Sequence, residues 1–140
     1  MTRVINPDSA GKQRNHLARA IALAVRELAR QTEPGGEARD LAAFIAVALK
    51  AIAEGIDTSV SAWEKRGYWV KADKFRMEWG WTGSLSEKMQ TAVLADDWAT
   101  VASLSAQTAQ KLSKIQISDH HRLGKPWVHA LDRLKASLAR

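Results

Sequence analysis

The sequence predicts an all-α protein, a single-domain bundle of five or six mostly antiparallel helices around one long central helix at about residues 37–66. Alanine, the residue that favours helix most strongly, accounts for 24 of the 140 residues, whereas proline occurs three times. Val, Ile and Thr do not form the alternating runs that are typical of strands. Apolar residues recur instead every three or four positions, which is the spacing of one face of a helix.

The first helix is expected at about residues 9–31, after an N-terminal tail of residues 1–8. Asp8 or Ser9 can act as its N-cap, because a side-chain oxygen there accepts a hydrogen bond from a free backbone N–H group. An apolar stripe that begins at Leu17 predicts the buried face. The basic side chains nearly opposite this stripe are Lys12, Arg19, Arg26 and Arg30.

The second helix is the long one, and Leu41, Ile45 and Leu49 share its main apolar face. Phe44 and Val47 lie off that face, and the alanines around them make the first half of the helix apolar on nearly all sides. Such a helix either occupies the centre of a bundle or packs against a second subunit. Phe44 and Val47 are therefore the candidate residues of a homodimer interface.

Gly67 interrupts the helical pattern, and it either separates two helices or lies within one longer helix. A third helix is expected at about residues 68–79. Its buried face is predicted to consist of Tyr68, Ala72, Phe75 and Trp79. Residues 80–83 predict a turn, and Ser84 with Glu87 has the spacing of a capping box at the start of a fourth helix.

Two further helices complete the prediction. Asp96 or Asp97 is expected to cap the fifth helix, and Pro126 suits the first position of the last one. The buried stripe of the last helix is predicted to consist of Trp127, Leu131, Leu134 and Leu138.

The composition excludes several classes of protein. A chain without cysteine has no disulfide bonds, no thiolate metal site and no cysteine nucleophile. The longest apolar run, residues 41–49, is too short to cross a bilayer, which takes about 20 residues. Residues 1–13 lack the apolar core of a signal peptide, so a soluble, cytoplasmic protein is expected.

The most unusual segment is Trp63–Trp81, with the sequence WEKRGYWVKADKFRMEWGW, which holds four of the six tryptophans. Basic residues alternate with its aromatic rings. This pattern is typical either of a nucleic-acid surface, where rings stack on bases and cations neutralise phosphates, or of an inward-packed aromatic seam. Trp69 and Trp81 are expected to be the most exposed rings. The candidate surface residues are Lys65, Arg66, Trp69, Lys74, Arg76 and Trp81, together with Arg19, Arg26 and Arg30 of the first helix.

The histidines offer three ring nitrogens near the carboxylate of Asp119. His120 and His121 are adjacent, whereas metal ligands on helices are usually three or four residues apart so that they converge. His129 is expected to project away from the apolar stripe of its helix. The sequence therefore predicts no metal site, no cofactor and no catalytic residue.

Three functions stay open at this point. The leading hypothesis is a non-enzymatic structural or protein-interaction module that forms a homodimer. The alternative is a nucleic-acid-associated module, to which the net charge of +6 would contribute. A third hypothesis is an enzyme or small-ligand pocket beside Tyr68, Asp73 and Arg76.

Overall fold

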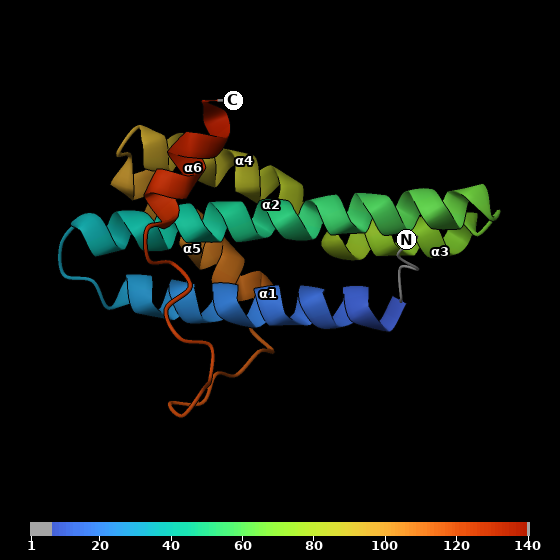
Figure 1. Ribbon diagram of the computed structural model, residues 1–140, viewed down its shortest axis with the longest axis horizontal. Coiled ribbons are helices and arrows are strands. Elements are labelled where there is room, and N and C mark those ends of the chain that lie inside the picture. The colour runs from blue at the N-terminus through green and yellow to red at the C-terminus, as the bar shows by residue number, and fades with distance from the viewer. Residues whose placement is uncertain (1–6, 140) are drawn as a thin grey trace.

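The computed structural model of the chain describes residues 7–139, and this range forms six helices and no strand (Figure 1). The helices are α1 (Pro7–Ala29), α2 (Gly36–Lys65), α3 (Trp69–Trp79), α4 (Trp81–Leu94), α5 (Trp98–Lys111) and α6 (Ala130–Leu138). The predicted all-α bundle and its long central helix are confirmed.

The central position of α2 explains why its first half is apolar on nearly all sides. Helices α1, α3, α4 and α6 all pack against it. Ile45 and Leu49 are fully buried, and burial of each such side chain contributes about 1.5–3 kcal/mol. Phe44 is only 9 % exposed and belongs to the same core, whereas Val47 is 39 % exposed. Of the two candidate dimer residues, only Val47 therefore remains at the surface.

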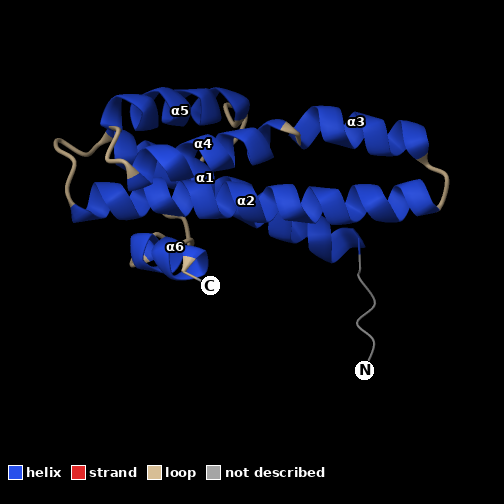
Figure 2. Ribbon diagram, turned by 90° about the horizontal axis from the view of Figure 1, so that it is seen from above, coloured by secondary structure: helices blue, strands red, loops and turns tan. Residues whose placement is uncertain are grey.

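The helices cover α2 unevenly along its length. Helices α1 and α2 are antiparallel neighbours. Helices α3 and α4 follow one another in nearly the same direction and are antiparallel to α2 (Figure 2). Helix α6 lies on the side of α2 opposite to α5 (Figure 2). We call the N-terminal half of α2 with α4, α5 and α6 the proximal half, and the C-terminal half of α2 with α3 and the start of α1 the distal half.

The start of α1 differs from the prediction. The helix begins at Pro7, so Asp8 and Ser9 lie inside it and neither is its N-cap. Proline is tolerated in the first turn because the N–H that it lacks would have no partner within the helix. Residues 1–6 of the expected tail lie outside the described residues.

The predicted turn at residues 80–83 is also wrong. Gly80 has φ −59° and ψ −25°, which are helical values, and α4 already begins at Trp81. Gly80 N donates to Arg76 O at 2.7 Å, so the chain passes from α3 into α4 with a single-residue interruption. Ser84 is consequently an internal residue of α4, and the capping box that begins there does not form.

The starts of the last two helices give one correct and one incorrect prediction. Asp97 is the N-cap of α5, since its side chain accepts a hydrogen bond from Thr100 N. Helix α6 begins at Ala130, four residues after Pro126. Its stripe is only partly as predicted. Trp127 and Leu134 are buried, Leu131 is partly buried and Leu138 is exposed.

Candidate functional site

The hairpin formed by α2 and α3 ends in a turn that we call the distal tip, residues 65–71. Backbone bonds fix this turn, because Arg66 N and Tyr68 N both donate to Trp63 O, at 3.1 and 2.9 Å. Gly67 has a φ of +81°. This conformation costs a residue with a Cβ about 1–2 kcal/mol. Gly67 therefore separates two helices and reverses the direction of the chain.

Three consecutive large side chains of the distal tip point into solvent. Tyr68 is 53 % exposed, Trp69 is 59 % exposed and Val70 is 69 % exposed. The exposure of Trp69 agrees with the prediction, whereas Tyr68 was expected on the buried face. Tyr68 is the residue that precedes α3, with φ −89° and ψ 61°, so it does not follow the helical spacing of the residues after it.

The inner face of α3 is an aromatic seam. Ala72 is fully buried, and Phe75 and Trp79 are partly buried against the core. The Trp63 and Phe75 rings meet edge to face at 4.8 Å. The Arg14 guanidinium of α1 lies over both α3 rings, 4.9 Å from the centroid of Phe75 and 5.4 Å from that of Trp79. These rings are therefore unavailable for stacking on bases.

Positive charge surrounds the exposed rings of the distal tip. Lys65, Arg66 and Lys74 are exposed, and among residues 10–139, whose side chains the structure describes, no carboxylate oxygen lies within 4.0 Å of their nitrogens. Lys71 Nζ lies 4.6 Å from the centroid of the Trp63 ring, where a cation is attracted by the ring face. The surface thus combines apolar side chains with cations that have no partner along the described chain.

Arg76 has a different role from these cations. Its Nη2 lies 2.7 Å from Glu64 Oε1, and its Nη1 donates to Asp73 Oδ1 at 3.0 Å. The hydrogen bond to Glu64, supported by the charges of both carboxylates, raises the pKa of Arg76 above its ordinary value. Arg76 ties α3 to α2. Tyr68, Asp73 and Arg76, beside which a pocket was predicted, are all exposed, and the hollow at Tyr68 is lined by residues 67–71 without Asp73 or Arg76.

Trp81, the other candidate ring, is packed at the junction of α3 and α4. It stacks on Trp79 with a centroid distance of 6.3 Å and an interplanar angle of 23°. Its Nε1 donates to Glu78 O at 3.1 Å. The ring is partly buried and lies outside the distal tip.

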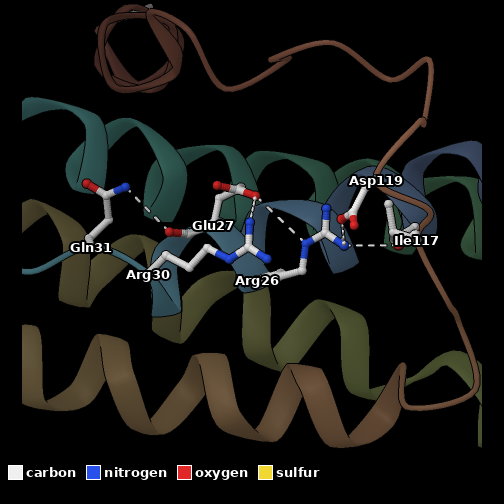
Figure 3. Close-up of polar contacts among 6 residues, drawn as sticks. All are labelled: Arg26, Glu27, Arg30, Gln31, Ile117 and Asp119. Atoms are coloured by element: carbon white, nitrogen blue, oxygen red, sulfur yellow. Dashed lines mark hydrogen bonds and ion pairs between the residues drawn. The ribbon is translucent and has the colours of Figure 1, made fainter.

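Two of the four basic residues in the stripe of α1, Arg26 and Arg30, contact other residues of the chain. Figure 3 shows Arg26 reaching the segment that follows α5, where its Nη1 donates to Ile117 O at 2.9 Å and lies 4.0 Å from Asp119 Oδ1. Arg30 Nη1 donates to Glu27 Oε1 at 3.1 Å (Figure 3). Arg19 is exposed.

The candidate basic residues do not form one surface. The C-terminal end of α1 and the turn between α2 and α3 lie at opposite ends of the molecule (Figure 1). A phosphate backbone that contacts the distal tip would therefore have to run the length of the bundle to reach Arg26 and Arg30. The structure does not bring together the two parts of the predicted nucleic-acid surface.

The histidines likewise form no common site. His121 Nδ1 accepts a hydrogen bond from Leu123 N at 3.2 Å, and His129 lies 4.0 Å from Asp132. Within the described part of the chain, no three His, Asp or Glu side chains come close enough to hold a metal ion.

The sequence interpretation missed two apolar residues of this region. Val70 and Met77, the latter 85 % exposed, lie seven residues apart on the face of α3 opposite Ala72. Their spacing was a visible signal, because an apolar pair at that distance lies on one face of a helix. It was not recognised because the aromatic residues defined a second, stronger stripe.

No protein-family model, no curated protein and no solved structure matches this chain. None of the helices within residues 7–139 is long and apolar enough to span a membrane.

Proposed function

We propose that this chain is a non-enzymatic protein-interaction module and that the distal tip is its binding surface. The observation that carries the proposal is the run Tyr68, Trp69 and Val70, each more than half exposed on a turn that the backbone fixes. Tyrosine and tryptophan dominate the binding energy of protein interfaces, and contiguous exposed apolar side chains mark such interfaces. A preformed turn also reduces the entropy lost when a partner binds.

The charges around the distal tip favour an acidic partner over a second copy of the chain. Two copies that met through this surface would bring Lys65 and Arg66 of one subunit against the same residues of the other. Like charges at an interface oppose association, whereas carboxylates on a partner would be attracted. The homodimer through Val47 remains a prediction, and it would leave the distal tip accessible. A cytoplasmic location also remains a prediction.

A nucleic-acid-associated function is the second candidate, because Trp69 is exposed beside Lys65 and Arg66. It has less support, since the rings of Phe75 and Trp79 are packed inward and Arg26 and Arg30 are paired. Nucleic-acid binding through the tip would depend steeply on salt, because phosphate contacts release counterions.

The test compares wild-type protein with a tip variant, Trp69→Ala combined with Val70→Ser, and with the control Met77→Ser. All three proteins are used as immobilised bait in a lysate and are titrated with single-stranded and duplex oligonucleotides at low and moderate salt. We expect wild type and control to retain the same acidic protein and the tip variant to lose it. Both variants should unfold within about 0.5 kcal/mol of wild type, because they change exposed side chains.

Two outcomes would contradict the proposal. Equal retention of the partner by the tip variant would remove the distal tip from the interface. Salt-sensitive quenching of tryptophan emission by oligonucleotides, lost in the tip variant, would instead make nucleic acid the partner.

A further inference from the structure

An apolar groove lies far from the distal tip, between the C-terminal half of α1 and helix α5. Its volume is about 440 Å³, within the usual range of about 300–1,000 Å³ for small-molecule sites. Val25 and Leu28 form one wall and Trp98 part of the other, and the loop of residues 31–34 also lines the groove.

Small side chains on α5 leave this groove open. Ala102, Ala106 and Ala109 line it from α5, and all three remain exposed. Close-packed helices normally fill such a seam with larger side chains, because an unfilled space loses dispersion contacts on one side. The open seam is therefore shaped to accept apolar atoms from outside the chain.

Ser105 supplies an independent sign of a missing partner. It lines the groove and is only 8 % exposed, and within the described residues its Oγ has no hydrogen-bond partner. A buried hydroxyl without a partner costs about 1–3 kcal/mol. Because Oγ itself is buried, the Ser105 side chain has to rotate toward the groove before it can bond a polar atom placed there, and that bond would recover part of this cost.

The described lining of the groove contains almost no charged side chains. Glu33, in the exposed loop of residues 31–34, is the only charged residue among the described residues that line it. No lysine, arginine or histidine of this described lining can neutralise a phosphate or a carboxylate. A buried charge requires an opposite charge beside it, and Glu33 is exposed to solvent, so the part of the ligand that enters the groove must be uncharged.

From these observations we propose that the α1–α5 groove binds an uncharged, largely apolar small molecule with one hydrogen-bonding group directed at Ser105 Oγ. The ligand body would contact Val25, Leu28 and the Trp98 ring. This site is separate from the distal tip, so it is independent of the proposed protein interaction.

The experiment uses N-phenyl-1-naphthylamine, an uncharged fluorescent molecule with two aromatic parts and one N–H group, titrated into the full chain. Ala106→Phe is designed to fill the groove, and Gln107→Phe adds the same ring on the opposite face of α5 as a control. Ser105→Ala removes the hydroxyl. Far-ultraviolet circular dichroism and thermal unfolding establish that each variant is folded, and Ala102→Phe serves as a second groove-filling variant.

We expect saturable binding of one molecule per chain to wild type and to Gln107→Phe. Ala106→Phe or Ala102→Phe should weaken binding at least tenfold. Ser105→Ala should weaken it about 2- to 10-fold, the loss expected for one hydrogen bond. The sulfonated analogue 1-anilinonaphthalene-8-sulfonate adds a negative charge to the same scaffold. Its binding to wild type and to Ala106→Phe should be equal, because a charged molecule does not enter the groove.

Three results would overturn the proposal. One is the absence of saturable binding to wild type, and another is equal binding by both groove-filling variants. The third is a wild-type dimer by light scattering that Ala106→Phe dissociates, because a second copy of the chain would then cover the groove.

Discussion

The proximal and distal halves of the bundle are stabilised by different means. In the proximal half, Ile45, Leu49 and Met89 are fully buried, and Ser86 Oγ donates to Ala46 O across the interface of α4 and α2. In the distal half, α3 covers the C-terminal half of α2, and several of its rings remain partly exposed. Cations there lie over aromatic rings, and an ion pair joins the two helices.

This difference indicates in which half exposed binding residues reduce the stability of the protein least. A helix hairpin with few neighbours cannot bury all of its faces, so the outer side of α3 keeps Val70 and Met77 in solvent. Apolar residues exposed there do not disrupt the close-packed core. The distal half can therefore carry interaction residues while the proximal half supplies most of the stability.

The largest expected effect comes from matched isoleucine truncations in the two halves of α2. Ile45→Ala, at a fully buried proximal position, should lower the free energy of unfolding by about 3–5 kcal/mol. Ile56→Ala, in the distal half and 4 % exposed, should cost about 2 kcal/mol, because it lies beside a small open hollow that already limits its packing. Urea unfolding measures both values, and equal costs would contradict the distinction between the halves.

A smaller effect is expected from two glycines of the distal half. Gly67→Ala should destabilise the protein by about 1–2 kcal/mol, because a Cβ disfavours the φ of +81° although the space around it is open. Gly55→Ala, within α2 and also in open space, should instead stabilise the protein by about 0.5–1 kcal/mol. Thermal unfolding of the two variants measures both changes in stability. A stabilising effect of Gly67→Ala would show that the turn does not hold residue 67 at a positive φ.

The smallest effect concerns Asp97, the N-cap of α5 in the proximal half. The Thr100 hydroxyl and then the Thr100 backbone N–H donate to its carboxylate, and this lowers the pKa of Asp97 below its ordinary value. Because the folded pKa is lowered, the stabilisation is complete above the unfolded pKa of about 3.9 and is lost as pH falls through the folded pKa.

The control for Asp97 is Asp97→Asn, which keeps a capping oxygen at every pH. Wild type should unfold at a slightly higher temperature than this variant at pH 7, and the difference should disappear on acidification below about pH 4. A difference that does not change between pH 7 and pH 2 would mean that the charge of Asp97 does not contribute.

Features that depend on residues close together in the sequence were predicted more accurately than features that depend on contacts between distant residues. The apolar spacing of α2 was predicted correctly, and Asp97 is one of the two caps predicted for α5, because both features depend on residues within one or two helical turns. The start of α6 was predicted incorrectly, because the group that caps this helix belongs to α2. Asp40 Oδ1 accepts a hydrogen bond from Leu131 N at 3.0 Å. Proline suits the first position of a helix, so Pro126 was the best local candidate, but α6 begins four residues later, where Asp40 can cap it.

The candidate site shows the same division. A prediction of exposure for Trp69 needed only its position on the helix after Gly67. The pairing of Arg26 with Ile117 O, 91 residues away, could not be read from the basic stripe of α1. Nor could spacing reveal that Arg14 would lie over the rings of Phe75 and Trp79.

The sequence alone determined the helical class, the long central helix and the inward face of α3, since alanine content and apolar periodicity act within each helix. Only the tertiary structure decided that Arg26 bonds Ile117 O and that small residues of α5 leave a groove beside Ser105. The physical reason is that burial and pairing depend on which helix faces which. That arrangement is set by packing between segments distant in the chain, and periodicity within one segment does not contain it.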